Sequence, residues 1–223
     1  MNLPKRIGLG FFIWIVVSLV LVSAWGWDQL RAFAGEWPRA FLLPAWLALS
    51  FYGASCDTRT SSSGGKREIR RHRQMLWMIF PLLLAWFVYL PFADRYGIGT
   101  ISSRTTRWTG LVLFATSLLI RIEAIRAQGK QFSMQVALQP NHNLTTSGPY
   151  CLIRHPAYLG VIGMVLGISL VFANVTVGLI MTLINWFWLS ARIRDEEKLL
   201  LDEFGEQYTI YRNRTRKIVP FVY

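Results

Sequence analysis

The stretch from residue 155 to residue 191, HPAYLGVIGMVLGISLVFANVTVGLIMTLINWFWLSA, decides the fold of this chain. Its 37 residues include no Asp, Glu, Lys or Arg. A straight helix of that length would reach about 56 Å, whereas the hydrocarbon core of a bilayer is about 30 Å thick. The stretch must therefore fold back on itself. Its least apolar part runs from Phe172 to Thr176, which predicts a helical hairpin with its turn near Asn174.

Four more uncharged stretches precede this hairpin. A helix needs about 20 apolar residues to cross a bilayer, and the first three stretches reach or approach that length. The fourth is shorter, and we expect it to continue as a helix through Arg121, Glu123 and Arg126, with its last charges at the membrane interface. The sequence thus predicts an all-α integral membrane protein with about six transmembrane helices, the four stretches being residues 7–27, 40–56, 75–93 and 108–120.

The composition supports a membrane protein and argues against other classes. Of the 223 residues, 53% are hydrophobic and 16% charged, which excludes a disordered chain. The formal net charge of +12 would suit a nucleic-acid binder, but the charges lie in short segments between apolar runs. The basic run 66–73 has no interleaved aromatic residues for stacking on bases, so we expect contact with membrane lipids and no nucleic acid. Cys56 and Cys151 predict neither a disulfide framework nor a metal site.

The distribution of basic residues predicts the orientation, because Lys and Arg are retained on the cytoplasmic side of a membrane. With the N-terminus inside, 19 of the 24 Lys and Arg residues fall in cytoplasmic segments and 5 outside. Six crossings also return the C-terminus to the cytoplasm. We therefore expect both termini, the loops around Lys66 and Asn141, and the active site to be cytoplasmic.

The domain organisation is simple. Residues 1–107 hold membrane helices without a recognisable motif, and residues 108–223 hold the motifs described below, so we expect one continuous membrane domain. The tail from residue 193 is more acidic, and apolar residues recur on one side of it at helical spacing. An amphipathic cytoplasmic helix is expected there, with a stripe made of Leu200, Phe204, Tyr208 and Tyr211.

Polar and turn-forming residues concentrate in segment 127–156, beside the predicted entrance of the hairpin. The pair Gly148-Pro149 predicts a turn, and Pro156 suits the first turn of a helix. Arg154 and His155 would then stand at a helix N-terminus, which attracts anions through free N–H groups and the helix dipole. The alternative is structural: Arg154 anchors the helix end at the lipid headgroups and His155 caps it.

The far end of the hairpin carries Arg192, Glu196 and Glu197. Arg192 and Glu196 share a helical face at i, i+4, and an ordinary solvated ion pair is the simplest interpretation. A tight hairpin, however, returns these residues to the neighbourhood of His155. Two arginines, one histidine and two glutamates would then meet at one side of the membrane, which favours a functional site.

The same residues carry a family resemblance. The run 142–160, HNLTTSGPYCLIRHPAYLG, followed by Glu196-Glu197 and by FGEQY at 204–208, resembles the isoprenylcysteine carboxyl methyltransferase family, which is related to the membrane phospholipid N-methyltransferases. The resemblance covers roughly residues 108–223. One departure is Thr145, where the family usually has Val.

The resemblance implies S-adenosylmethionine as the cofactor and no glycine-rich Rossmann loop. It implies that Glu196, with Glu197 beside it, holds the cofactor, plausibly through its amino group, and that Arg192 orients the substrate. Arg154 is a second candidate for the catalytic set, and Gly160 is expected to allow close helix packing. The remaining residues implied to line the cofactor site are Gln135, His142, Asn143, Leu144, Tyr150, His155, Pro156, Ala157 and Tyr158.

Methyl transfer to the carboxylate of an isoprenylcysteine-like lipidated acceptor is the activity that the resemblance favours. The acceptor's lipid would enter the site laterally from the bilayer. Transfer to the amine of phosphatidylethanolamine stays open, and an amine acceptor would need Glu196, Glu197 or His155 to take a proton. A further alternative is an NADPH-dependent sterol reductase, whose Arg-Asp pair is echoed by Arg194-Asp195; those enzymes usually have an acid where Val161 stands here.

Overall fold

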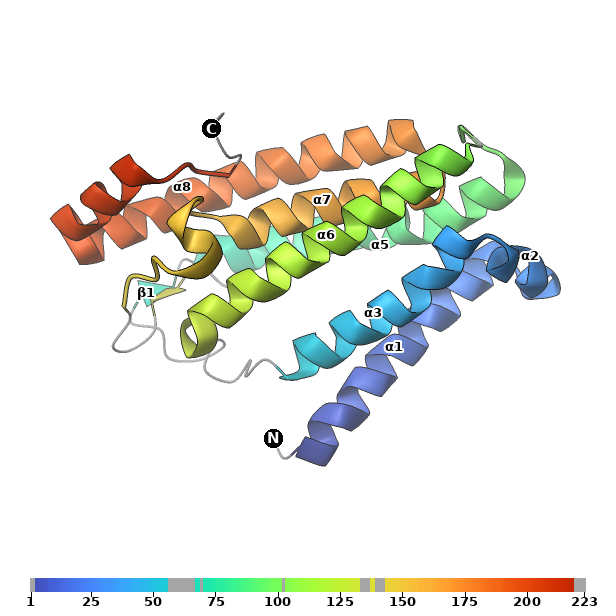
Figure 1. Cartoon of the computed structure of the whole chain (residues 1–223), viewed down its shortest axis with the longest axis horizontal. Coiled ribbons are helices and arrows are strands. Elements are labelled where there is room, and N and C mark those ends of the chain that lie inside the picture. The colour runs from blue at the N-terminus through green and yellow to red at the C-terminus, as the bar shows by residue number, and fades with distance from the viewer. Residues whose placement is uncertain are drawn as a thin grey trace. The chain divides into compact units, whose positions relative to one another are not determined.

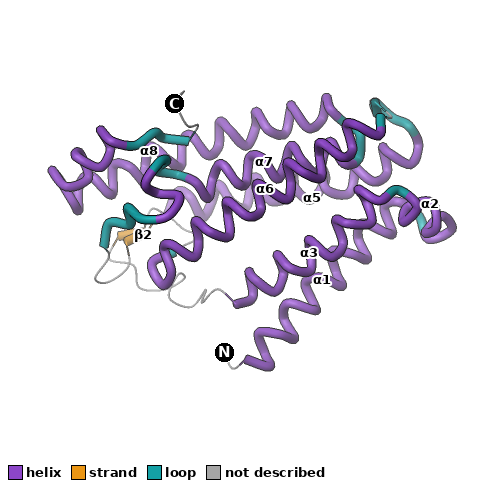
Figure 2. The backbone as a smooth tube through the Cα atoms, in the orientation of Figure 1, coloured by secondary structure: helices purple, strands orange, loops and turns teal. Residues whose placement is uncertain are grey.

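The computed structural model is almost entirely helical (Figures 1 and 2), as the sequence predicted. It describes residues 3–55, 67–68, 70–101, 103–132, 137–138 and 143–218. The described strands are the two-residue β1 (Arg67–Glu68) and β2 (Ala137–Leu138), which pair antiparallel. The helices are α1 (Leu3–Trp25), α2 (Leu30–Gly35), α3 (Trp37–Ser55), α5 (Arg70–Tyr96), α6 (Arg104–Gln128), α7 (Pro156–Val171) and α8 (Val175–Arg214), with short 3-10 turns at Trp27–Gln29, Gly129–Gln131 and Gly148–Cys151.

The predicted hairpin turn is confirmed. Helix α7 ends at Val171 and α8 begins at Val175, and Ala173 between them adopts a positive φ of 53°. Asn174 stabilises the turn in two ways. Its side-chain oxygen accepts a hydrogen bond of 3.2 Å from the backbone N–H of Val177, as an N-cap residue does. Its amide nitrogen donates to the carbonyl of Ile98 at 3.2 Å.

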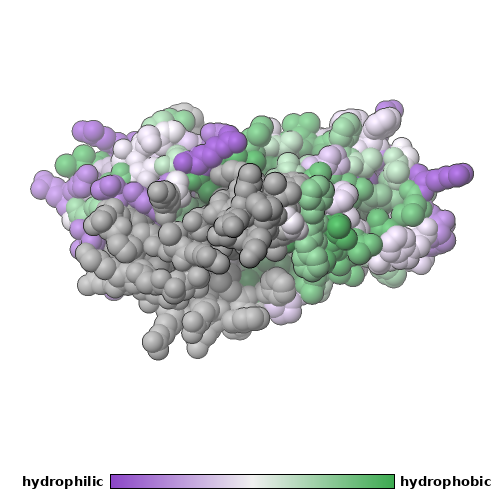
Figure 3. Space-filling model, turned by 90° about the horizontal axis from the view of Figure 1, so that it is seen from below, coloured by the Kyte–Doolittle hydropathy of each residue, from purple (hydrophilic) through white to green (hydrophobic). Residues whose placement is uncertain are grey.

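Two described helices, α6 and α8, are long and apolar enough to cross a membrane. A third span results if Gly10–Trp25 and Trp27–Gly35, which are bent by 89° at their junction, count as one. Helix α7 is apolar but shorter. Many large apolar side chains are exposed, among them Phe12, Val112 and Phe187, and apolar residues cover a broad part of the face seen in Figure 3. Such a surface suits lipid contact.

The chain forms two compact units that interleave along the sequence. The first comprises Met1–Cys56, Ile79–Thr116 and Gly163–Thr182, and the second comprises Asp57–Met78, Ser117–Ile162 and Leu183–Tyr223. In the first unit, α6 and α7 approach closely at two glycines. A Cβ on Gly110 would lie 2.6 Å from Leu170 Cβ, and one on Gly167 would lie 2.7 Å from the Phe114 nitrogen. Small residues at helix contacts are typical of membrane proteins.

The first unit also contains a buried ion cluster. Asp94 of α5 accepts hydrogen bonds from Arg39 of α3 at 2.9 Å and from Arg107 of α6 at 2.6 and 2.8 Å. The arginines also donate to the carbonyls of Ala32 and Val171, at 2.9 and 2.8 Å. Three helices of this unit are thus joined through one carboxylate, and the paired charges offset the cost of burying each other.

The tail of the second unit differs from the prediction. The helix expected from residue 193 is not a separate element, because α8 continues through that position to Arg214. The break comes at Gly205 (φ 51°, ψ −118°), where the chain reverses, as the red end of α8 shows in Figure 1. Arg216 then pairs in parallel with Ile153. Of the predicted stripe, Tyr208 and Tyr211 are buried and Leu200 and Phe204 partly buried.

Candidate active site

Local backbone geometry in the second unit brings the site together. Gly148 has a φ of 60°, which glycine adopts without strain, and opens the 3-10 turn Gly148–Cys151. Pro156 is the first residue of α7, as predicted. Gly160 lets α7 lie against α6, because a Cβ there would be 2.7 Å from Arg121 Cβ and 2.8 Å from the Ser117 carbonyl oxygen. The prediction that Gly160 permits close packing is confirmed.

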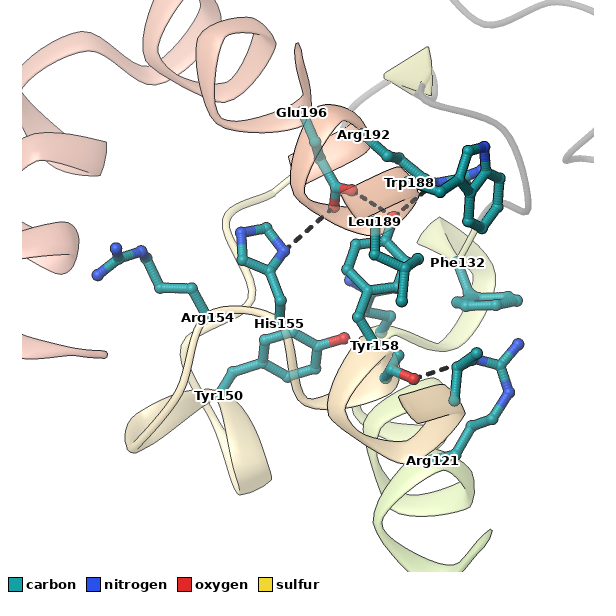
Figure 4. A pocket seen from close by; sticks show the side chains of 13 residues that line it. Arg121, Phe132, Tyr150, Arg154, His155, Tyr158, Trp188, Leu189, Arg192 and Glu196 are labelled. Atoms are coloured by element: carbon teal, nitrogen blue, oxygen red, sulfur yellow. Dashed lines mark hydrogen bonds and ion pairs between the residues drawn. The ribbon is translucent and has the colours of Figure 1, made fainter. Parts of the chain in front are cut away.

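A pocket of about 680 Å³, its open mouth included, lies at the start of α7 and beside the charged part of α8 (Figure 4). Seven of the predicted site residues line it: Tyr150, Arg154, His155, Ala157, Tyr158, Arg192 and Glu196. Residues from both ends of the hairpin therefore meet at one pocket.

Tyr158 of α7 connects an acidic and a basic side chain of α8, Glu196 and Arg192. Its hydroxyl donates to Glu196 Oε2 at 2.6 Å and accepts from Arg192 Nε at 2.7 Å. The guanidinium carbon of Arg192 also lies 5.6 Å from the Tyr158 ring centre and 5.9 Å from that of Trp188, within the range of cation–π contact. Arg192 is 4% exposed, so hydrogen bonds and rings hold its orientation.

His155 lies between the two glutamates and is almost fully buried. Its Nδ1 is 4.0 Å from Glu196 Oε1, and its Nε2 is 3.5 Å from Glu197 Oε1. The ring stacks on Tyr158 with centres 5.6 Å apart and an interplanar angle of 13°. His155 therefore packs against the phenol that joins Arg192 to Glu196.

Arg154 and Glu197 fasten the returning tail. Arg154 Nε donates to Glu197 Oε1 at 2.9 Å, and its Nη1 donates to the carbonyls of Arg212 and Thr215 at 2.9 and 2.5 Å. In Figure 4 the Arg154 side chain points away from Tyr158, although the residue lines the pocket. Lys217 Nζ lies 3.9 Å from Glu197 Oε2. These contacts favour a structural part for Arg154 and Glu197.

Other predicted residues lie elsewhere. The backbone N–H of Asn143 donates to the Gln131 side chain at 3.3 Å, and neither Asn143 nor Leu144 is among the described residues that line the pocket. Pro156 serves as the helix start. Gln135 and His142 lie outside the described residues.

Tyr150 forms part of the pocket wall and is held by its backbone. Its carbonyl accepts a hydrogen bond of 2.9 Å from the Tyr211 hydroxyl. Burial raises the pKa of the Tyr150 phenol well above its ordinary value, so the group stays protonated. Tyr150 thus presents a neutral aromatic ring to the pocket.

Six residues of the pocket are outside the predicted set of site residues, although one of them, Gln128, belongs to the polar segment 127–156. Arg121 had been interpreted only as an interface charge of its helix. Phe132 and Trp188 could not be recognised as site residues from the sequence, because 14% of all residues are Phe, Trp or Tyr and aromatic residues are also common at membrane interfaces. A search along the α8 helical face that carries Arg192 would have found Trp188, four residues earlier. The six residues are Arg121, Gln128, Phe132, Val161, Trp188 and Leu189.

Comparison with known proteins identifies the family. The profile of the isoprenylcysteine carboxyl methyltransferase (ICMT) family matches residues 108–202. A probable protein-S-isoprenylcysteine O-methyltransferase of Oryza sativa subsp. indica is 31% identical over 178 residues, covering 79% of this chain and 87% of the rice protein. The protein-S-isoprenylcysteine O-methyltransferase of Schizosaccharomyces pombe is 27% identical over 233 residues, covering 96% of this chain and 89% of the yeast protein.

A solved structure supports the fold. The eukaryotic intramembrane Ras methyltransferase ICMT matches with a TM-score of 0.56 and 21% identity, covering 100% of this chain and 88% of that chain. The fold and the family match thus define an intramembrane methyltransferase. The chain belongs to the isoprenylcysteine carboxyl methyltransferase family. It is a protein-S-isoprenylcysteine O-methyltransferase-like enzyme of the membrane, and the resemblance noted in its sequence is confirmed.

Proposed function

We propose that this enzyme transfers a methyl group from S-adenosylmethionine to the C-terminal carboxylate of an isoprenylated cysteine. The observation that carries the proposal is the hydrogen-bonded series Glu196–Tyr158–Arg192 in the pocket wall. It places a carboxylate and a guanidinium on either side of one phenol oxygen. Family membership supports the same reaction.

The donor set fits S-adenosylmethionine. Glu196 offers a carboxylate oxygen to the ammonium group of its amino acid part. The rings of Phe132, Tyr158 and Trp188 line the same pocket and suit a flat base or a sulfonium cation. When bound, this cofactor supplies an electrophilic methyl group. The protein's part is then to align the donor and acceptor, which is the main source of acceleration for such a displacement.

The charges of the pocket favour a carboxylate acceptor over an amine. Arg121, Arg192 and Glu196 line it, together with Arg154, whose charge is paired with Glu197. A carboxylate is already ionised at pH 7 and needs a cation to hold it, which Arg192 provides. The ammonium group of phosphatidylethanolamine would first have to lose a proton, and Glu196, the one carboxylate among the described pocket residues, is assigned to the cofactor and already accepts a hydrogen bond from Tyr158.

The membrane arrangement that we propose has six spanning helices, with both termini, the amphipathic tail and the pocket at the cytoplasmic face, and with residues 108–223 as the catalytic core. The excess of basic residues on one side supports it, as does the family match over residues 108–202. An impermeant thiol reagent added to intact cells should label Tyr96→Cys but not Thr146→Cys, in a background without Cys56 and Cys151. The opposite labelling would reject this orientation.

The activity is tested with radiolabelled S-adenosylmethionine and either an isoprenylated cysteine peptide or phosphatidylethanolamine. We expect base-labile label in the peptide, as a methyl ester gives. Arg192→Lys should lower turnover strongly at unchanged cofactor affinity, because Lys cannot hold a carboxylate bidentately. Arg194→Lys, on the exposed side of the same helix, is the matched control and should be nearly silent. Base-stable label that requires phosphatidylethanolamine, with an indifferent Arg192→Lys, would reject the proposal.

A further inference from the structure

Trp188 contributes a donor that the reaction described so far does not use. It lies one helical turn before Arg192 on α8 and lines the pocket beside it (Figure 4). Its indole N–H is buried and has no hydrogen-bond partner in the described part of the chain. A buried donor without a partner destabilises a folded protein, so the donor calls for an acceptor, and because Trp188 lines the pocket a bound ligand is the candidate.

The chemistry of this wall limits what the acceptor can be. Arg192 carries only donors, and an indole nitrogen carries only a donor. The guanidinium carbon lies 5.9 Å from the Trp188 ring centre, so the two residues are neighbours in this wall. A group that satisfies both must accept at least two hydrogen bonds and tolerate a positive neighbour. A carboxylate meets these conditions, whereas an ammonium, which can only donate, meets neither.

We infer that Trp188 is a specificity-determining residue, whose indole N–H joins Arg192 in binding the carboxylate of the acceptor. The inference rests on the proposed function and extends it, because it explains how the site distinguishes a free carboxylate from its methyl ester. In the free acid both oxygens are anionic acceptors, and their lone pairs suffice for a bidentate guanidinium and for the indole N–H together. Methylation neutralises the charge and blocks one oxygen, so the product binds more weakly and leaves. The N–H is buried in the structure. Hydrogen bonds in active sites commonly reach their final geometry only when the ligand is bound, so we expect the N–H to meet the carboxylate in the complex.

The test is equilibrium binding of N-acetyl-S-farnesylcysteine and its methyl ester to the purified full chain in lipid nanodiscs. The measured quantity is the ratio of the two dissociation constants, which cancels changes in prenyl binding and in overall pocket shape. Trp188→Phe keeps an aromatic ring against Arg192 and removes the N–H together with the rest of the pyrrole ring, a loss of volume that the control Trp186→Phe shares. The preference for the acid should fall roughly ten-fold in this variant, since hydrogen bonds to charged groups are the strong ones. Trp186→Phe, on the same helix but not among the described pocket residues, should keep the wild-type ratio.

A Trp188→Phe ratio equal to wild type would overturn the inference, as would an equal fall in Trp186→Phe or a wild type that binds acid and ester alike. The proposed function is judged separately, by whether wild type forms base-labile methyl ester. If it forms the ester while Trp188→Phe keeps the wild-type ratio, only the role of Trp188 fails. If it forms none, the function fails, and the binding ratio still decides whether Trp188 recognises a carboxylate.

Discussion

Replacing Tyr158 by Phe tests the centre of the site with the loss of a single oxygen atom. That oxygen donates to Glu196 at 2.6 Å and accepts from Arg192 at 2.7 Å, so both charged groups lose a partner together. The ring itself remains, and its stacking on His155 is unaffected. Helix α7 should therefore fold normally in the variant.

The size of the effect follows from the two bonds. A hydrogen bond to a charged group is worth roughly 1.5–3 kcal/mol, and two that share one oxygen are not fully additive. We expect Tyr158→Phe to lose about 2–4 kcal/mol of transition-state stabilisation, which is roughly 30- to 1,000-fold in kcat/KM. The assay is methyl ester formation on a farnesylated cysteine substrate, with both the donor and the acceptor concentrations varied.

Tyr211→Phe is the matched control. It also removes a buried tyrosine hydroxyl, but one that donates to the neutral carbonyl of Tyr150 at 2.9 Å. This variant should lower the melting temperature slightly and keep kcat/KM within about three-fold, since a neutral hydrogen bond contributes roughly 1 kcal/mol. A Tyr158→Phe enzyme within three-fold of wild type, or one impaired no more than Tyr211→Phe, would refute the reasoning about the shared oxygen.

Three further predictions concern the donor site, the helix contact and the buried ion cluster. Glu196→Gln should weaken binding of S-adenosylmethionine at least ten-fold by calorimetry, while Glu203→Gln, at an exposed position, should bind normally; equal affinities would remove Glu196 from the donor site. Gly160→Ala should lower thermal stability and activity together, because a Cβ 2.7 Å from the facing helix overpacks the contact by about 1–3 kcal/mol, and a wild-type melting curve would contradict this. Asp94→Asn should destabilise by about 3–5 kcal/mol, since it leaves two buried arginines without their anion. Asp28→Asn, at a largely exposed ion pair, should be nearly silent in the same unfolding assay.

Most of the helical architecture could be predicted from hydropathy and from the positions of turn-forming residues. The 37-residue uncharged stretch is too long for one crossing, and Asn174 is a polar residue suited to a turn. The continuation of α6 through Arg121 and the start of α7 at Pro156 follow from ordinary helix rules and are confirmed. These features depend on local sequence alone, so they can be predicted without knowledge of the tertiary structure.

The tail and part of the pocket depend on tertiary structure and were out of reach. A single glycine inside an acidic helical pattern does not predict that the chain changes direction. Gly205 nevertheless adopts a φ of 51° and turns the chain back. The pairing of Arg216 with Ile153 joins positions far apart in sequence. The placement of Tyr158 between Arg192 and Glu196 likewise depends on the angle at which α7 and α8 pack, which no spacing rule supplies.

The hydrogen bonds from Arg154 to the carbonyls of Arg212 and Thr215 have a consequence for the order in which the enzyme folds during synthesis. Arg154 is translated 61 residues before Thr215, whose carbonyl it binds. The entrance of α7 can be inserted early, but the Arg154 guanidinium finds these partners only after residues 212–215 have left the ribosome. Contacts of such long sequence separation form late and slowly. The entrance of α7 is therefore fixed only after α8 has been made, and a nascent chain that ends before Arg212 would already be a membrane protein without yet being an enzyme.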